Sequence, residues 1–168
     1  MEPAQTKNNV LDKEAINRKI RRMALEIAEQ NIDEKELIIA GITGNGEIVA
    51  RCMVSELEKN SSFQIKSITI QLNKKDPLEV SFQPAVEVGN KVIIVVDDVA
   101  NTGRTMLYAL KPFLAAHPKK IQTLVLVERS HKLFPIQTDY FGLSITTTLQ
   151  EHIKVETEGE ALTGAILF

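Results

Sequence analysis

The sequence has 168 residues, with 20 Lys and Arg against 22 Asp and Glu, and its formal net charge of −2 excludes a protein that coats nucleic acid through net charge alone. With 43% hydrophobic and 25% charged residues it has the composition of a soluble globular protein, and its length predicts one domain over residues 1–168. The single cysteine, Cys52, excludes a disulfide within the chain and any cysteine-rich metal site. We expect a reducing, cytoplasmic setting.

The polar N-terminus is not expected to be a targeting segment. Residues 1–9 have no apolar stretch, which predicts a polar, disordered tail rather than a signal peptide. The longest aliphatic run, Val92 to Val96, has five residues, which is too short to span a membrane. The three histidines show no spacing typical of metal ligands, so no protein-built metal site is predicted.

Helical and apolar segments alternate from Asp12 onwards. Asp12 can cap a helix that runs to about Gln30, because apolar residues follow helical spacing there. Pro112 lacks an amide donor and is expected to bend the last predicted helix. Strands alternating with helices predict an α/β fold with a mostly parallel twisted sheet flanked by helices. The predicted strands cover residues 37–42, 63–72, 78–82, 92–96 and 121–127, and the later helices cover 48–57 and 103–116.

Two acids, Asp97 and Asp98, stand at the carboxyl end of the most apolar strand and precede a turn rich in hydroxyls and glycine. Ligands of parallel sheets bind beyond the carboxyl ends of the strands, so this segment is the candidate site. Gly103 lets the backbone approach a phosphate, and Thr102 and Thr105 add hydroxyl donors. The carboxylates would repel a phosphate, so we interpret them as acceptors for sugar hydroxyls. A sugar phosphate satisfies both halves, although helix capping by Asp98 is an alternative.

The segment from Val95 to Thr105 resembles the loop with which type I phosphoribosyltransferases bind phosphoribosyl pyrophosphate: hydrophobic residues, two acids and a Thr-Gly-x-Thr turn. The segments Val10 to Asp12 and Leu126 to Gly142 are similar to those of the bacterial pyrimidine-operon regulators that are also uracil phosphoribosyltransferases. The resemblance extends from Val10 to about Val155. It implies a parallel sheet with flanking helices and a small hood over the base.

This resemblance implies a reaction in which a nucleobase nitrogen, of uracil or another pyrimidine, displaces pyrophosphate from the sugar. Asp97 and Asp98 are then the catalytic acids that hold the ribose hydroxyls, and Mg²⁺ is bound mainly through the substrate. The resemblance also implies a homodimer or larger homo-oligomer, and it places Arg129, Ser130 and His131 at the base. The expected residues for the 5-phosphate are Ala100, Asn101, Thr102, Gly103, Arg104 and Thr105.

The sequence departs from the family at the pyrophosphate loop, which usually reads Lys-Thr-Arg-Gly. Two cations are missing, so pyrophosphate would depend on backbone amides and transferase activity is expected to be low. Lys74 and Lys75, in a predicted flexible loop, are candidates to restore part of this charge, with a solvated lysine turn as the alternative. The residues at the pyrophosphate loop are Thr43, Gly44, Asn45 and Gly46.

Basic residues gather on the first predicted helix and raise an RNA-binding alternative, a nucleotide-sensing regulator of pyrimidine genes with little or no catalysis. Glu14 and Glu26 lie four residues from Arg18 and Arg22, which favours an ordinary salt-bridged surface. RNA is therefore a less favoured partner than a small-molecule substrate, and no membrane partner is expected. The basic residues are Arg18, Lys19, Arg21 and Arg22.

Overall fold

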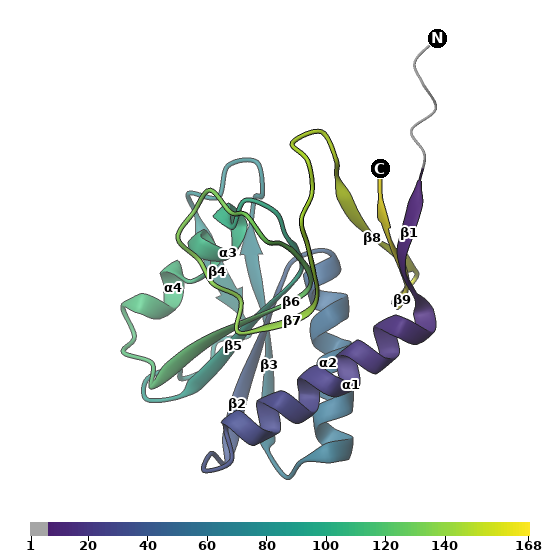
Figure 1. Ribbon diagram of the computed structural model, residues 1–168. Helices are drawn as coiled ribbons and strands as arrows, with labels where there is room; N and C mark the ends of the chain where they lie inside the picture. Colours follow the sequence, from purple (N-terminus) through teal and green to yellow (C-terminus); the bar gives the residue numbers. More distant parts are fainter. Residues whose placement is uncertain (1–6) are drawn as a thin grey trace.

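The computed structural model describes residues 7–168, and thirteen helices and strands follow one another within this range (Figure 1). The helices are α1 (Lys13–Gln30), α2 (Asn45–Asn60), α3 (Arg104–Ala109) and α4 (Lys111–Leu114). The strands are β1 (Asn8–Asp12), β2 (Glu36–Ile42), β3 (Gln64–Leu72), β4 (Val80–Gln83), β5 (Val92–Ala100), β6 (Lys120–Arg129), β7 (Tyr140–Ile145), β8 (Ile153–Glu158) and β9 (Ala161–Leu167).

The larger sheet within residues 7–168 has six strands in the order β4-β3-β2-β5-β6-β7. Its strands are parallel except β4, which pairs antiparallel with β3. The predicted fold class, α/β with a mostly parallel sheet, is confirmed. The central strands β2 and β5 lie side by side, so their carboxyl ends meet at one edge of the sheet.

Both faces of this sheet are buried, which explains the nearly continuous apolar runs of its strands. Ile39 and Ile94 point to the face covered by α1 and α2, whereas the neighbouring Ile38 and Ile93 point to the face where Phe113 of α4 packs. Figure 1 shows these two helical layers on opposite sides of the sheet. The sheet is therefore a rigid support for residues at its edge.

The helix α1 confirms the prediction for residues 12 to 30. Asp12 caps it, since its Oδ1 accepts a hydrogen bond of 2.7 Å from the backbone amide of Ala15. Among residues 7–168, no helix is long and apolar enough to cross a membrane. The buried side chains of α1 are those of the predicted stripe: Ile16, Ile20, Met23, Ala24 and Ile27.

The prediction of one bent helix over residues 103–116 is wrong. The segment forms two short helices, α3 and α4, separated at Leu110. Pro112 lies in the first turn of α4, where the missing amide has no intrahelical partner to lose. Proline thus starts a second helix instead of bending the first.

A smaller antiparallel sheet, β1-β9-β8, packs beside α1 and the end of β5. Asn8 and Asn9 belong to β1, so the expected tail over residues 1–9 has regular structure at these two positions. The rest of that tail, residues 1–6, lies outside the described residues. This sheet matters for function because β8 reaches the edge of the candidate site, where the hood is expected.

Candidate active site

The strand β5 continues beyond Val96 and carries the paired acids within its last residues. Asp97 pairs with β6, opposite Val125, and Asp98 follows it in the same strand. Asp97 is only 2% exposed. Each carboxylate accepts the next backbone amide at 2.9 Å: Asp98 donates to Asp97 Oδ1, and Val99 donates to Asp98 Oδ1. Ladder pairing and these bonds hold both carboxylates at the carboxyl end of the sheet.

The Asp97 carboxyl group is difficult to ionise. Burial raises its pKa, the charge of Asp98 raises it further, and the ammonium of Lys74 opposes both effects, which leaves the pKa at about 7. Lys74 Nζ lies 3.2 Å from Asp97 Oδ1 and 3.9 Å from Asp98 Oδ1. Asp97 therefore changes its protonation state near neutral pH, unlike an ordinary aspartate.

The turn after β5 is shaped by Gly103, whose φ of +84° favours glycine. A Cβ at this position would lie 2.3 Å from Ile136 Cγ2, so the connection between β6 and β7 packs directly on the turn. The carbonyl oxygen of Thr102 accepts hydrogen bonds of 3.0 Å from the amides of Leu133 and Phe134. The β6–β7 connection thus fixes the backbone of the predicted phosphate turn.

A buried ion pair anchors the same connection. Lys132 Nζ donates to Glu128 Oε2 at 2.8 Å, and the side chains of Lys132 and Glu128 are 12% and 10% exposed. Thr138 Oγ1 donates to the same carboxylate oxygen. Although burial raises the pKa of Glu128, the bonds from Lys132 and Thr138 hold it below its usual range. Glu128 consequently remains charged and ties both ends of the connection together.

The predicted pyrophosphate loop begins the helix α2. This helix starts at Asn45, three residues earlier than predicted, because Gly44 with φ of +91° ends the preceding loop. Asn45 Nδ2 donates to Asp98 Oδ2 at 3.1 Å and to the carbonyl oxygen of Val155 at 3.3 Å. A Cβ on Gly46 would lie 3.0 Å from Asp97 Oδ1, so glycine lets the first turn of α2 approach the acids.

A cavity of about 200 Å³ brings the predicted acids, phosphate turn and Lys74 together. Ile153, Lys154 and Val155 of β8 also line it, and sequence reasoning missed them. The available signal in the sequence was the alternation of apolar and charged residues from Ile153 to Glu156. Thr43, Gly44, Asn45, Gly46 and Lys75 do not line this cavity. Its other lining residues are Asp97, Asp98, Val99, Ala100, Asn101, Thr102, Gly103, Arg104, Thr105 and Met106.

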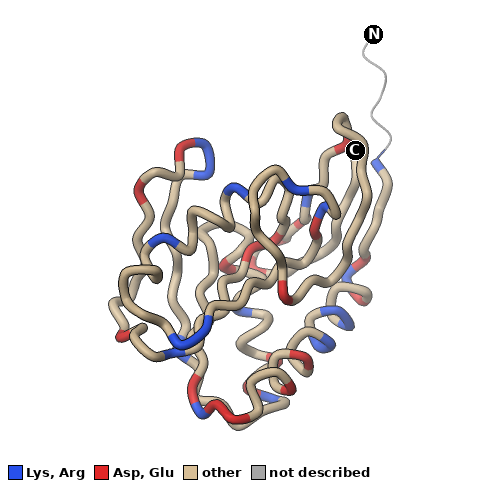
Figure 2. Tube along the Cα trace, turned by 60° about the vertical axis from the view of Figure 1, so that its left-hand side comes forward, with Lys and Arg blue, Asp and Glu red and all other residues tan. Residues whose placement is uncertain are grey.

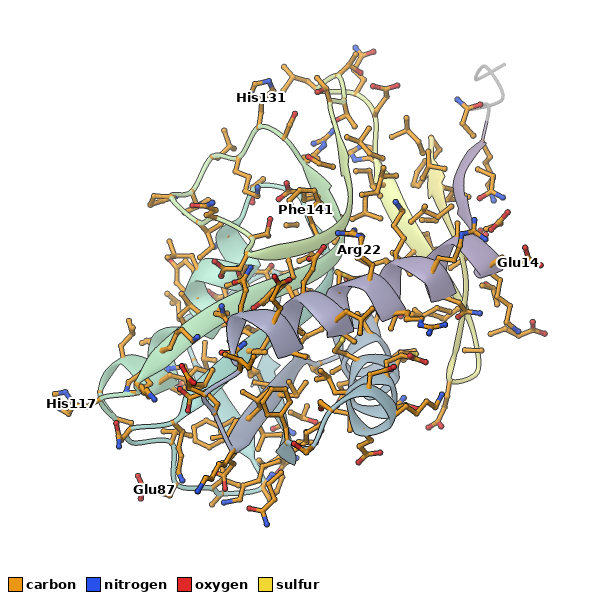
Figure 3. All side chains as sticks on the ribbon, turned by 60° about the horizontal axis from the view of Figure 1, so that its bottom comes forward. Glu14, Arg22, Glu87, His117, His131 and Phe141 are labelled. Carbon is orange, nitrogen blue, oxygen red and sulfur yellow. The ribbon has the colours of Figure 1, made fainter. Side chains whose placement is uncertain are left out.

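The three residues predicted at the base do not line this cavity either. Arg129 Nη2 donates to the carbonyl oxygens of Thr148, at 2.8 Å, and Glu151, so its guanidinium braces the connection between β7 and β8. The hydroxyl groups of Ser130 and Thr146 lie 3.0 Å apart. His131 is exposed on the β6–β7 connection, away from α1 (Figure 3).

The acid pair matches what Mg²⁺ requires from a protein. No group of three or more His, Cys, Asp or Glu side chains that could hold a metal is found among residues 7–168. Mg²⁺ is usually bound by one or two carboxylates together with oxygens of a phosphate ligand. Asp97 and Asp98 supply two carboxylates beside the phosphate turn, so they fit a cation that is shared with a substrate.

A parallel sheet with two acids and a phosphate-type turn at the carboxyl end of one strand defines a phosphoribosyltransferase-type protein. Residues 6–159 match the family described as "Phosphoribosyl transferase domain", and the chain belongs to this family. It is 35% identical over 163 residues to the "Bifunctional protein PyrR" of Staphylococcus carnosus, covering 89% of this chain and 93% of that protein. The protein of the same name from Clostridium kluyveri is 35% identical over 156 residues, or 88% of each chain.

Solved structures confirm the fold. The hypoxanthine phosphoribosyltransferase of Trypanosoma cruzi superimposes with a TM-score of 0.78 at 13% identity, over 94% of this chain and 95% of that chain. A hypoxanthine-guanine phosphoribosyltransferase of Bacillus anthracis gives a TM-score of 0.71 at 17% identity, over 84% of each chain. At these identities the likeness establishes the arrangement of the helices and strands. It does not identify the substrate, which must be inferred from the site residues.

Proposed function

We propose that the protein binds phosphoribosyl pyrophosphate with Mg²⁺ and transfers its phosphoribosyl group to a nucleobase, uracil or another pyrimidine. The observation that carries the proposal is that Asp97, Asp98 and the turn from Asn101 to Thr105 line the same cavity. Acceptors for hydroxyl groups and donors for a phosphate lie side by side there. The match of residues 6–159 to the phosphoribosyl transferase family supports this class of reaction.

The two ends of the cavity have different roles in this proposal. Backbone amides and the hydroxyls of Thr102 and Thr105 hold the 5-phosphate, and Asp97 and Asp98 accept hydrogen bonds from the ribose hydroxyls. Positive charge develops on the sugar as its bond to pyrophosphate breaks. The Asp98 carboxylate stabilises that charge from a position fixed by Asn45.

Asp97 and Asp98 are also the residues that would hold Mg²⁺ together with substrate oxygens. When bound, the cation neutralises the negative charge of the leaving pyrophosphate. The base is expected on the β8 side of the cavity, which is lined by the apolar residues Ile153 and Val155. Because Thr43 to Gly46 contains no cation, we expect slow turnover.

Turnover with labelled phosphoribosyl pyrophosphate and a panel of bases tests the proposal. We expect Mg²⁺-dependent nucleotide formation, coupled to pyrophosphate release and fastest with a pyrimidine. Hydrolysis without nucleotide formation for every base would contradict it. Sedimentation of the same sample tests the expected homo-oligomer.

The RNA-binding alternative depends on the basic residues of α1, and contacts within the chain occupy two of them. Arg18 lies 3.9 Å from Glu14, and Arg22 lies 2.6 Å from Glu26. Arg22 Nη2 also donates to the carbonyl oxygen of Phe141 in β7 at 2.7 Å, and Figure 3 shows the two residues side by side. Basic and acidic residues mix along α1 (Figure 2). Salt-sensitive binding to a pyrimidine-operon leader RNA is thus expected to be weak.

A further inference from the structure

The ammonium group of Lys74 contacts both acids, Asp97 and Asp98, in the proposed site. Its ammonium donates to both oxygens of Asp97, at 3.2 and 3.4 Å, and lies 3.9 Å from Asp98 Oδ1. The side chains of Asp97 and Asp98 are 3% and 14% exposed, whereas the Lys74 side chain is 43% exposed. The Lys74 ammonium is therefore accessible from solvent, whereas the two carboxylates are largely buried.

The backbone near Lys74 has a defined structure. It follows β3 in the turn that leads to β4, where the Lys75 amide donates to Asn73 Oδ1 at 3.0 Å and the Asp76 amide donates to the Asn73 carbonyl at 3.1 Å. Beyond the turn, Lys111 Nζ of α4 donates to the Leu78 carbonyl at 2.7 Å. The turn thus presents Lys74 to the cavity, and rotation of its long side chain moves the ammonium without moving the turn.

Two other basic residues, Arg104 and Lys154, line the cavity. Within the described residues 7–168, neither forms an ion pair with Asp97 or Asp98. The guanidinium of Arg104 lies 5.9 Å from the ring centroid of Tyr108, and Lys154 comes from β8. Lys74 is the cation that competes with any ligand for the oxygens of Asp97. A sugar hydroxyl and the Lys74 ammonium cannot occupy the same carboxylate oxygens at once.

We propose that Lys74 is a specificity-determining residue, which selects sugar phosphates with a diphosphate at the anomeric carbon over sugar monophosphates. This inference rests on the proposed function. Any sugar whose hydroxyls bind Asp97 and Asp98 must displace the ammonium. Ribose 5-phosphate offers the displaced cation no new partner near the acids, whereas the diphosphate offers several oxygens. Lys74 therefore opposes the first ligand and favours the second.

The missing cations of the Thr43 to Gly46 loop strengthen this argument. That loop carries no positive charge, so a displaced Lys74 is available to supply positive charge to the diphosphate. Discrimination between two ligands is the difference between their affinities. Here Lys74 lowers the affinity for the monophosphate and raises the affinity for the diphosphate. Removing the ammonium is expected to change the two affinities in opposite directions, which a merely structural residue would not do.

Calorimetric titrations of ribose 5-phosphate and of phosphoribosyl pyrophosphate, each with Mg²⁺, test the inference. We expect Lys74→Gln to bind ribose 5-phosphate about 3- to 10-fold more tightly than the wild type and phosphoribosyl pyrophosphate about 10-fold more weakly, the size of effect typical of one ion pair. Lys74→Arg keeps the charge and should retain the preference for the diphosphate. Lys35→Gln removes a lysine charge at the opposite end of the sheet and should change neither affinity.

The outcomes separate this inference from the proposed function. If the wild type binds neither ligand, the proposed function fails and the inference fails with it. If the wild type binds both, and Lys74→Gln changes the two affinities in the same direction or leaves them unchanged, the inference alone is overturned. Thermal unfolding of each variant shows that the titrated protein is folded.

Discussion

The side-chain amide of Asn45 connects to Asp98 by a hydrogen bond of 3.1 Å and, through its second donor contact, to the carbonyl oxygen of Val155 at 3.3 Å. One neutral side chain thereby joins the start of α2, the end of β5 and the strand β8. The family motif usually has a cation in this loop. In this chain the position holds a neutral side chain that contacts one member of the acid pair.

Replacing Asn45 should weaken ligand binding more than folding. Asn45→Ala removes both contacts and leaves Asp98 free to turn, so we expect about 10-fold weaker binding of phosphoribosyl pyrophosphate, the loss typical of a hydrogen bond to a charged group. Asn45→Asp places a third carboxylate beside Asp98 and should weaken binding further. Calorimetry gives the affinities, and equal losses for the two variants would show that Asn45 acts without contact to Asp98.

Restoring one cation to the pyrophosphate loop should raise turnover. Thr43→Lys adds positive charge and keeps the hydrogen bonds from Asn45 to Asp98 and Val155. A cation or donor positioned at a developing charge typically changes the rate by about 10²–10³. We therefore expect at least a tenfold increase, with a smaller gain for Asn45→Arg because it loses the contacts to Asp98 and Val155. Unchanged turnover in Thr43→Lys would show that the backbone amides suffice.

The pKa of Asp97 predicts a pH-dependent cost in stability. The ordinary pKa of aspartate is 3.8, and burial followed by the charge of Asp98 raises it to about 7 in the folded protein. The folded state then binds more protons than the unfolded state between these values, so the free energy of unfolding falls as pH rises from about 4 to about 7.

The isosteric variant Asp97→Asn removes this dependence. We expect its free energy of unfolding at pH 8 to exceed that of the wild type by about 1–3 kcal/mol, because one pKa unit corresponds to about 1.4 kcal/mol. The difference should shrink at pH 5. Urea denaturation at both pH values measures it, and a variant that is less stable than the wild type at pH 8 would contradict the assignment.

A side chain at position 103 should lower the stability of the protein. Gly103→Ala combines a φ of +84° with a Cβ placed 2.3 Å from Ile136 Cγ2, and we expect it to lower the free energy of unfolding by about 2–4 kcal/mol. Gly159 is a matched control, since its φ is +61° and no atom lies within 4 Å of its Cβ position. Gly159→Ala should cost about 1 kcal/mol, the strain of the backbone alone. Equal costs in urea denaturation would mean that the β6–β7 connection does not press on the turn.

Local patterns predicted the elements whose causes are local. The helix α1 follows from the cap at Asp12 and one apolar stripe, and the buried strands follow from continuous apolar runs. The break between α3 and α4 could not be predicted, because Pro112 is compatible with a bend or with a helix start, and tertiary packing of Phe113 decides between them. The strand β8 pairs with β9, and its position at the cavity depends on its contacts with β5, which is far away in the sequence.

The candidate site shows the same division. The acids and the turn from Asn101 to Thr105 are contiguous in sequence, and the motif placed them in one site. The contacts of Lys74 with Asp97, across 23 positions, and of Asn45 with Asp98, across 53 positions, depend on the order of strands in the sheet. No spacing rule reports such contacts, which is why Lys74 was predicted as a candidate to restore charge at the pyrophosphate site and its contact with Asp97 was not predicted.

A crystal structure of the protein with phosphoribosyl pyrophosphate and Mg²⁺ tests the central claim most directly. Our account predicts the 5-phosphate on the turn from Asn101 to Thr105, the ribose hydroxyls within hydrogen-bond distance of Asp97 and Asp98, and the Lys74 ammonium displaced toward the diphosphate. A ligand bound elsewhere, with Lys74 still on Asp97 and the turn unoccupied, would contradict it.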